Sequence, residues 1–421
     1  MNKNKAISAI DIGSSKITVV IANVSVEPAT MAKTINIVGV ASVQSQGVKK
    51  GQIVNIDEAI EATISAVEAA ERMAGYNLGQ AFISVGGAHI ASQNSNGVVA
   101  VSDPEGEVNA SDVERVIEAA SAVSLPSSRE LIHIVPRDFI VDGEGGVKDP
   151  VGMSGVRLEV QTHLVTASKA ALKNLGKTIS EVGVDINEVV FSGLAASEAV
   201  LSPTEKELGC ILVDIGSGVT SIAAFVDGSL SYSGTIPIGS RNVTNDLAIG
   251  LRVSLESAEK IKLMLSQESL NDKKISEQID ISKFGSSEAK KVSKRTLVEG
   301  IIRPRLNEIF TIVRLDLEKA DIMNKVPSGV ILTGGGAETI GVVESAKKVM
   351  SLPARKGVPS GVGGLVDDIL SASFATVIGL VVYGANKEIE AQAPTGKHFG
   401  LSTKGVGIFS KLVDTIKELL P

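Results

Sequence analysis

The sequence predicts an α/β protein that arose by duplication, with two halves placed around a nucleotide cleft. A short loop that opens with aspartate and continues into glycine occurs twice, beginning at Asp11 and at Asp214. Each copy follows an apolar stretch typical of a buried strand. A third glycine-rich segment, residues 334–336, follows another apolar stretch late in the chain. One such loop is an ordinary turn, but two copies 203 positions apart favour a repeated fold that grips one ligand.

Length and charge narrow the class of protein. The chain has 421 residues, which predicts two to four domain-sized units. Hydrophobic residues make up 43% and charged residues 21%, so the chain can build an ordinary globular core. The formal net charge of −7 argues against a nucleic-acid-binding protein, which usually carries a basic domain.

The cysteine content and the hydropathy of the chain indicate the cellular compartment in which the protein is expected. Cys210 is the sole cysteine and lies in an apolar run, so we expect a small buried side chain and no internal disulfide. A reducing compartment, the cytoplasm, is the simplest expectation. The apolar N-terminal stretch resembles a signal peptide but is interrupted by Asp11 and Lys16. No apolar run reaches the ~18 residues of a transmembrane helix.

The two aspartate loops have the composition of phosphate-binding loops. Small residues let backbone N–H groups approach phosphate oxygens closely, and a lysine adds a positive charge. An aspartate at the end of each preceding strand can hold the hydration shell of Mg²⁺, so Asp11 and Asp214 are the predicted magnesium residues, acting through water. The predicted ATP-binding residues of the first loop are Asp11, Gly13, Ser14, Ser15 and Lys16. Those of the second are Asp214, Gly216, Ser217, Gly218 and Thr220.

Three further segments are predicted to complete the ATP site. Glycines in the late segment permit close approach of a flat ligand, and the residues concerned are Gly334, Gly335, Gly336 and Ala337. A dinucleotide-binding loop fits poorly, because its third glycine would fall on Thr339. Glu259 and Lys262 lie three residues apart in a charged helix and can hydrogen-bond a ribose. Gly239 is also assigned to the ATP site.

The combination of loops resembles the actin, heat-shock chaperone and sugar kinase superfamily, and a finer match points to one family. Residues 83–87 read Ile-Ser-Val-Gly-Gly and residues 94–99 read Asn-Ser-Asn-Gly-Val-Val. Residues 149–160 read Asp-Pro-Val-Gly-Met-Ser-Gly-Val-Arg-Leu-Glu-Val, after His133, Pro136, Phe139 and Asp142. Over essentially the whole chain this resembles the FtsA family of cell-division proteins.

The resemblance implies an actin-like (ribonuclease H-like) duplicated fold with an inserted α+β subdomain and a C-terminal amphipathic helix. We expect subdomain 1A at 1–82 and 164–192, and the insert, subdomain 1C, at 83–163. The pattern of residues places the beginning of this unit near Ala81, with a strand at 81–85 and a hairpin at 94–97. We expect subdomain 2A at 193–227 and 301–384, and 2B at 228–300. A linker at 385–404 and a membrane-targeting helix at 405–421 complete the chain.

The C-terminal segment has the pattern of a helix that lies on a membrane. At 100° per residue, its apolar side chains share one arc, and they are Ile408, Phe409, Leu412, Val413, Ile416, Leu419 and Leu420. Lys411 and Lys417 are offset by Asp414 and Glu418, so cationic attraction to lipid is modest. We expect one copy to bind weakly and reversibly, and self-assembly to supply avidity. The alternative is a helix that docks on its own core.

The resemblance also implies function and partners. FtsA binds ATP, forms filaments on the inner face of the cytoplasmic membrane at the division site, and anchors the ring of the tubulin-like protein FtsZ. The expected partners are the FtsZ C-terminal tail, further copies of the chain and membrane lipid, with no nucleic acid. Lys294, Arg303 and Arg305 are the predicted contacts for the acidic FtsZ tail.

Fast hydrolysis is not expected. In the chaperone branch a Glu-Pro pair precedes a small-residue helix upstream of the second loop, whereas this chain has Ser192-Gly193. Glu198 lies near but is expected on the helix surface. We therefore predict ATP and Mg²⁺ binding with slow hydrolysis and no identified catalytic residue. Two alternatives are a PilM-like protein of type IV pilus assembly, which would not need residues 405–421, and a small-molecule kinase, for which no substrate base is found.

Overall fold

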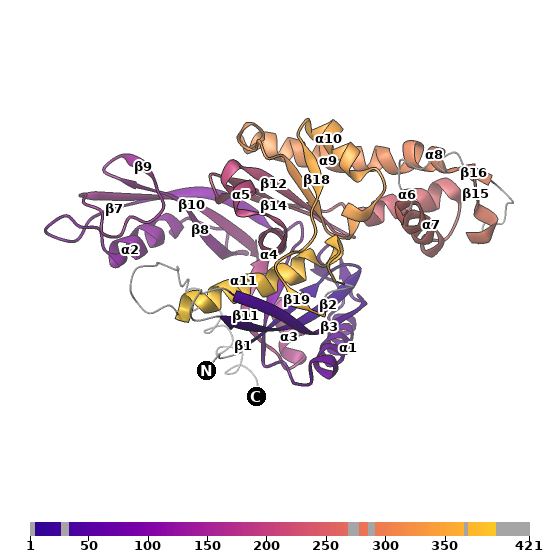
Figure 1. The fold of residues 1–421 in the computed structure, drawn as a ribbon, viewed down its shortest axis with the longest axis horizontal. Helices are drawn as coiled ribbons and strands as arrows, with labels where there is room; N and C mark the ends of the chain where they lie inside the picture. Colours follow the sequence, from indigo (N-terminus) through magenta and orange to yellow (C-terminus); the bar gives the residue numbers. More distant parts are fainter. Residues whose placement is uncertain (1–4, 27–32, 268–277, 285–290, 366–368, 393–421) are drawn as a thin grey trace.

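A computed structural model describes residues 5–26, 33–267, 278–284, 291–365 and 369–392. Its first half is built on a six-stranded sheet in the order β11-β6-β1-β2-β3-β19. Helices α1 (Ile56–Ala74) and α3 (Lys169–Glu181) pack on one face (Figure 1). The strands are β1 (Lys5–Ile12), β2 (Lys16–Val26), β3 (Lys33–Gln44), β6 (Gln80–Val85), β11 (Asp185–Phe191) and β19 (Gly363–Gly364).

The second half repeats this arrangement. Its sheet has the order β14-β13-β12-β17-β18, which matches β3-β2-β1-β6-β11 strand for strand. In both sheets the strand that ends in the aspartate pairs antiparallel with the next strand and parallel with a later one. The strands are β12 (Cys210–Ile215), β13 (Thr220–Val226), β14 (Ser229–Ile236), β17 (Val330–Thr333) and β18 (Ala354–Lys356). The predicted duplication is therefore confirmed.

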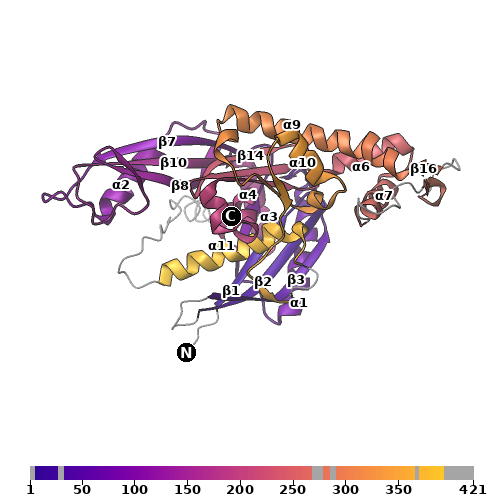
Figure 2. The same ribbon diagram turned by 45° about the horizontal axis from the view of Figure 1, so that its top comes forward.

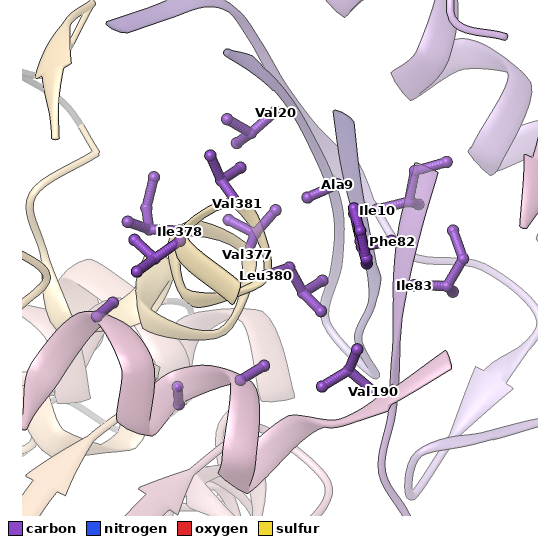
Figure 3. Close-up of a cluster of buried hydrophobic side chains, with 14 of the residues drawn as sticks. Ala9, Ile10, Val20, Phe82, Ile83, Val190, Val377, Ile378, Leu380 and Val381 are labelled. Atoms are coloured by element: carbon purple, nitrogen blue, oxygen red, sulfur yellow. The ribbon is translucent and has the colours of Figure 1, made fainter. Parts of the chain in front are cut away.

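A layer of two helices separates the sheets. Helices α4 (Ser192–Val200) and α11 (Ala375–Gln392) belong to the same buried core as β1, β2 and β6, and this core also includes Leu212 and Phe225 of the second sheet. In Figure 3, Val377 and Val381 of α11 point toward the first sheet. Helix α9 (Arg303–Lys319) runs along the opposite side of the second sheet (Figure 2). The two sheets therefore share one helical layer.

The second half carries further elements around this sheet. Helix α10 (Val342–Met350) and α9 pack in a second buried core with α6 (Ser240–Leu251) and α7 (Leu255–Gln267). Helices α6 and α7 lie at one end of the molecule, with the hairpin of β15 (Gln278–Asp280) and β16 (Lys291–Ser293) (Figure 1). The shorter elements are β4 (Val48–Lys49), β5 (Gln52–Ile53), α5 (Pro203–Leu208), η2 (Ile281–Phe284), α8 (Lys294–Leu297), η3 (Val298–Ile302), η4 (Met323–Lys325), η5 (Gly335–Glu338) and η6 (Ala372–Phe374).

An inserted unit projects from the opposite end. Its four-stranded sheet has the order β7-β10-β8-β9, with helix α2 (Ala110–Ser121) packed on it (Figure 1). The strands are β7 (Ala91–Ala100), β8 (Arg129–Val141), β9 (Glu144–Val147) and β10 (Arg157–Ser168). Asn109 and Asp112 form a reciprocal capping box at the start of α2, which fixes where the helix begins.

Two expectations about the insert differ from the structure. Strand β6 lies between β11 and β1 in the first sheet, so residues 81–85 do not open the insert. Its side chains from Ala81 to Val85 are all buried, as a strand covered on both faces requires. The expected hairpin at 94–97 is wrong, because β7 is one continuous strand paired with β10 from Ala91 to Ala100.

Two boundaries in the second half also differ. Strand β14 pairs with β13 in the second sheet, so residues 229–236 do not belong with the helices that follow. Helix α11 continues to Gln392, and the start of the linker at 385 was wrong. Alanine, lysine and glutamate in 385–392 favour helix, and the first proline comes only at Pro394.

The remaining linker and the predicted membrane helix at 405–421, with Ile408 to Leu420, lie outside the described residues. Within the described ranges, no helix combines the length and apolar character needed to span a bilayer.

Candidate functional site

The two aspartates occupy equivalent places at the ends of β1 and β12. In the first sheet Asp11 lies opposite Thr18, and Ser84 at the end of β6 donates a hydrogen bond to Asp11 Oδ1 at 2.5 Å. In the second sheet Asp214 lies opposite Ser221 and beside Thr333. Directly opposed residues in paired strands point to the same face. Each sheet therefore presents a polar row centred on its aspartate.

Burial disfavours charge on both carboxylates. Burial raises the pKa of Asp11, although the Ser84 hydroxyl and the positive charge of Lys16 act in the opposite direction. Burial also raises the pKa of Asp214 to about 7, and the charge of Asp11 adds to this shift, while a hydrogen bond from Thr376 Oγ1 at 3.0 Å opposes it. The two carboxylates are thus close enough to influence each other, and a cation between them would relieve both.

Lys16 is the positively charged residue of the first loop. Its ammonium lies 3.4 Å from the centre of the Phe374 ring and donates to Ser373 Oγ at 3.4 Å. Burial lowers the pKa of Lys16, and the nearby Asp11 carboxylate raises it. Phe374 and Ser373 come from the segment before α11, so the C-terminal part of the second half holds the lysine of the first loop.

The two loops have the same backbone fold and face each other. Gly13 N–H donates to Lys16 O at 3.0 Å, and Gly216 N–H donates to Val219 O at 2.9 Å, the same pattern 203 positions later. A Cβ on Gly218 would lie 2.9 Å from Ser14 Oγ, so only glycine permits this approach. Ser14 Oγ also accepts from Gly51 N–H at 2.8 Å. The structure therefore brings the two predicted phosphate loops together, as the sequence predicts for one shared ligand.

Gly239 lies directly behind the second loop. It precedes α6, whose first amides donate to that loop: Ser240 N–H to Gly216 O and Arg241 N–H to Ser217 O, both at 2.9 Å. Thr220 Oγ1 donates to Ile238 O at 2.8 Å. These bonds fix the second loop to the start of α6, so Gly239 supports the loop from behind. In the first loop, the backbone carbonyl of Ser15 accepts a hydrogen bond from Ser45 N–H at 2.9 Å, and Ser15 is exposed.

The late glycine segment lies against the end of β12. A Cβ on Gly334 would lie 2.2 Å from Asp214 Oδ1, and its φ of +81° also requires glycine. Gly336 lies against Ile215, and Ala337 is buried in the second core. Gly335 is more open than Gly334 and Gly336. The glycine segment and the second aspartate loop thus form one continuous surface.

Glu259 and Lys262 form a compact cluster on α7. Lys262 Nζ lies 2.8 Å from Glu259 Oε2, and both contact the Thr244 hydroxyl of α6, at 3.0 and 2.5 Å. Lys262 is 6% exposed, so its charge is stabilised by Glu259 and Thr244 rather than by water. One turn later, Ser266 Oγ accepts from Ile340 N–H at 3.2 Å. Helix α7 is thereby fixed next to the glycine segment.

A pair of hydroxyls lies between the halves at the start of α4. Ser192 Oγ, at the start of α4, is 2.9 Å from Ser221 Oγ, and a Cβ on Gly86 would lie 2.7 Å from Ser192 Oγ. Glu198 pairs with Lys206 at 2.7 Å, away from this pair. Within the described residues, no group of three or more histidine, cysteine, aspartate or glutamate side chains could hold a metal by itself.

The three predicted partner-binding cations do not form one open patch. Arg305 holds Asp246 through two hydrogen bonds of 2.6 and 3.0 Å and also contacts Glu308. Arg303 contacts Glu299 at 2.8 Å, and Lys294 is 6% exposed. An acidic peptide would therefore have to compete with acidic side chains of the protein itself.

Several polar residues near the loops were not singled out from sequence. Ser84 was identifiable, because it is the single hydroxyl in the buried strand Gln80–Val85. Thr376, Ser373 and Phe374 lie more than 150 positions from the loops they contact and have no local motif. Such contacts follow from the path of the chain in three dimensions.

Comparisons with known proteins now decide the family. The description "SHS2 domain inserted in FTSA" matches residues 87–166, and "Cell division protein FtsA" matches residues 211–379. The cell division protein FtsA of Pseudomonas aeruginosa is 36% identical over 393 residues, which is 93% of this chain and 92% of that protein. The chain belongs to the FtsA family. The resemblance read from residues 83–160 is confirmed.

Solved structures confirm the actin-like fold. The "PilM-PilN type IV pilus biogenesis complex" aligns with a TM-score of 0.62 at 16% identity, covering 90% of this chain and 98% of that chain. MreB5 of Spiroplasma citri bound to ADP aligns with a TM-score of 0.53 at 14% identity, covering 92% and 98%. At these identities the likeness concerns the fold alone. Similarity to PilM therefore carries no claim on pilus assembly, and the FtsA relationship decides between the two.

Proposed function

We propose that this FtsA-family protein binds ATP with Mg²⁺ between its two aspartate loops. The observation that carries the proposal is the meeting of the loops, where Gly218 approaches Ser14 and leaves room for no side chain. Both loops are rich in glycine and serine, and such small residues let backbone N–H groups approach phosphate oxygens closely. The glycine segment at 334–336 and the cluster on α7 are the proposed adenosine side.

The carboxylates fit a hydrated magnesium ion. Asp214 has its pKa raised to about 7, in part by the charge of Asp11, so the pair gains from a cation. Magnesium keeps several of its waters, and the two carboxylates would bind those waters. When bound, the ion would neutralise phosphate charge. Lys16, held over Phe374, would contribute a second positive charge from the other side.

Hydrolysis is proposed to be slow. Ser192 and Ser221 are hydroxyls hydrogen-bonded to each other, and a hydroxyl of ordinary pKa does not take a proton from water. Such a pair can orient a water molecule without activating it. ATP is then mainly a ligand that sets the relative position of the two halves.

Family membership supports the cellular part of the proposal. We infer that the protein forms filaments on the inner face of the cytoplasmic membrane at the division site. We also infer that it anchors FtsZ by binding the C-terminal tail of FtsZ. Lipid contact is assigned to the helix at 405–421. The FtsZ tail is assigned to the face with Lys294, Arg303 and Arg305, where its acidic groups would replace Asp246 and Glu299 as partners of the arginines.

A vesicle pelleting assay tests this proposal. The intact chain and a truncation lacking residues 405–421 are mixed with anionic phospholipid vesicles, with and without ATP and Mg²⁺. We expect the intact chain to pellet, more so with ATP, and the truncation to stay in solution. A matched control replaces Leu412 and Ile416 by Asp, which keeps the length but removes apolar area from the segment. Equal pelleting of all three proteins contradicts the membrane assignment.

A further inference from the structure

The insert is covalently part of the first half, but it is hydrogen-bonded to the second. Ser92 Oγ on β7 donates to Ser233 O at 2.7 Å, and Ser233 N–H donates back to Ser92 Oγ at 3.1 Å. β14 is the edge strand of its sheet, so these backbone groups would otherwise lack a ladder partner. Ser92 of the insert therefore satisfies both backbone groups of Ser233 at the edge of the second-half sheet.

A buried histidine strengthens this junction. His163 on β10 lies 3.0 Å from Ser233 Oγ through Nε2 and 2.7 Å from Asn94 Oδ1 through Nδ1. His163 is 1% exposed, and burial lowers its pKa to about 3, so the ring is neutral. An amide oxygen only accepts, so Nδ1 carries the proton and Nε2 accepts from the Ser233 hydroxyl. All hydrogen-bonding atoms of the ring are satisfied.

The same strand leads to the proposed ATP site. Thr235, two residues from Ser233, points to the same face of β14, and its Oγ1 lies 3.4 Å from Ser221 Oγ. Ser221 contacts Ser192 at 2.9 Å and lies opposite Asp214. A row of polar side chains therefore extends from the second aspartate loop along one face of β14 to the insert, and Ser221, Ser233 and His163 of this row are buried.

The insert is also fixed to the first half at its base. Within the insert, Arg129 donates to His89 O at 2.9 Å, and its contacts with Thr166 tie β8 to β10. His133 Nε2 accepts from Phe191 N–H at 2.9 Å, which joins β8 to the end of β11. The insert therefore bridges the halves, and a change in their relative position must alter its contacts with one half or the other.

We propose that His163 and Ser92 are positioning residues that couple the insert to the nucleotide cleft through Ser233 of β14. When a ligand moves the halves relative to each other, the insert follows β14 rather than the first sheet alone. Coupling is reciprocal, so loosening this junction changes nucleotide affinity as well. This inference rests on the proposed ATP site.

Hydrogen exchange on the full chain tests the coupling. Amide exchange is measured in β7 and β10 with and without ATP and Mg²⁺, and ATP affinity is measured by calorimetry on the same samples. His163→Leu removes both ring contacts while keeping the volume similar, and Ser92→Ala removes the contact with the β14 backbone. Thr162→Val is the matched control, because Thr162 is equally buried but donates within the insert, to Ser95 O at 3.1 Å.

We expect ATP to change exchange in β7 and β10 of the wild type at least about 5-fold, a typical size for coupling between sites. His163→Leu and Ser92→Ala should lose this ATP-dependent change and shift ATP affinity by the same factor, while Thr162→Val retains both. A merely structural role would speed exchange equally with and without ATP. That result, or an unchanged ATP response in His163→Leu, overturns the proposal.

The experiment separates the two proposals. If the wild type binds ATP but β7 and β10 do not respond, the coupling is wrong and the ATP site stands. If calorimetry detects no ATP binding at all, the ATP site itself is wrong, and the coupling falls with it.

Discussion

The two halves have the same sheet order and the same loop, but they balance the charge of their aspartates differently. In the first half Lys16 follows Asp11 in the loop and lies near it. Both aspartates accept a hydrogen bond from a hydroxyl, Ser84 for Asp11 and Thr376 for Asp214, but in the second half Val219 takes the place of the lysine. The duplicated scaffold is thus symmetric in backbone and asymmetric in charge. The charged form of Asp214 therefore depends more on an added cation than the charged form of Asp11 does.

The largest expected effect comes from the helical layer that the two sheets share. A Cβ on Gly379 of α11 would lie 1.8 Å from Ala195 O of α4, so Gly379→Ala must separate these helices. We expect a loss of about 3 kcal/mol in the free energy of unfolding. Urea denaturation followed by circular dichroism measures it.

Gly176→Ala is the control for this prediction. Gly176 is also in a helix, α3, but nothing lies within 4 Å of an added Cβ. We expect it to stabilise the protein by about 0.5–1 kcal/mol, because alanine favours helix. Equal effects at the two positions would show that α4 and α11 do not hold the halves together as described.

Much of this architecture was predictable from sequence, for physical reasons. Asp11 and Asp214 could be found because a buried strand ending in aspartate and glycine is a local pattern. The sequence predicts a hairpin at 94–97 and places β6 in the insert because turn residues are a local signal, whereas the pairing of β7 with β10 and of β6 with β1 joins distant segments. Thr376, Phe374 and the Ser92–Ser233 contact depend on segments brought together from far along the chain, and no local pattern reveals them.

The next largest effect concerns how the free energy of unfolding depends on pH through each of the two aspartates. Because the pKa of Asp214 is raised to about 7 in the fold, the folded protein holds a proton that the unfolded chain releases between about pH 4 and 7. Without a divalent cation, stability from this group is therefore present at low pH and lost as pH rises through 7. We expect Asp214→Asn to remove about 2 kcal/mol of this decline between pH 5 and pH 8.

Urea titrations at pH 5 and pH 8 in a chelator measure this decline. Asp11→Asn is the companion variant, and we expect it to change the decline less, because the Ser84 hydroxyl and the charge of Lys16 both oppose the raised pKa of Asp11. Addition of Mg²⁺ should stabilise the wild type more at pH 8 than at pH 5. An identical pH dependence of the two variants would contradict the charge asymmetry.

The smallest expected effect concerns the lysine itself. Lys16→Met keeps a long side chain over Phe374 but removes the charge, and we expect ATP affinity to fall about tenfold, the size of one charge-assisted contact. Val219→Met, at the equivalent place in the second loop, should leave ATP affinity within about twofold. Fluorescence titration with a labelled ATP analogue measures both. A larger loss in Val219→Met than in Lys16→Met would reverse the assignment of the cation to the first loop.

The central proposal is that the two aspartate loops form a single nucleotide site. Calorimetric titration of ATP with Mg²⁺ into the wild type, Asp11→Asn, Asp214→Asn and the double variant tests it. One ATP should bind per chain, each single variant should bind more weakly, and the two losses should be non-additive, because both carboxylates act on the same ion. Wild-type affinity in the double variant, or two independent sites per chain, would contradict the account.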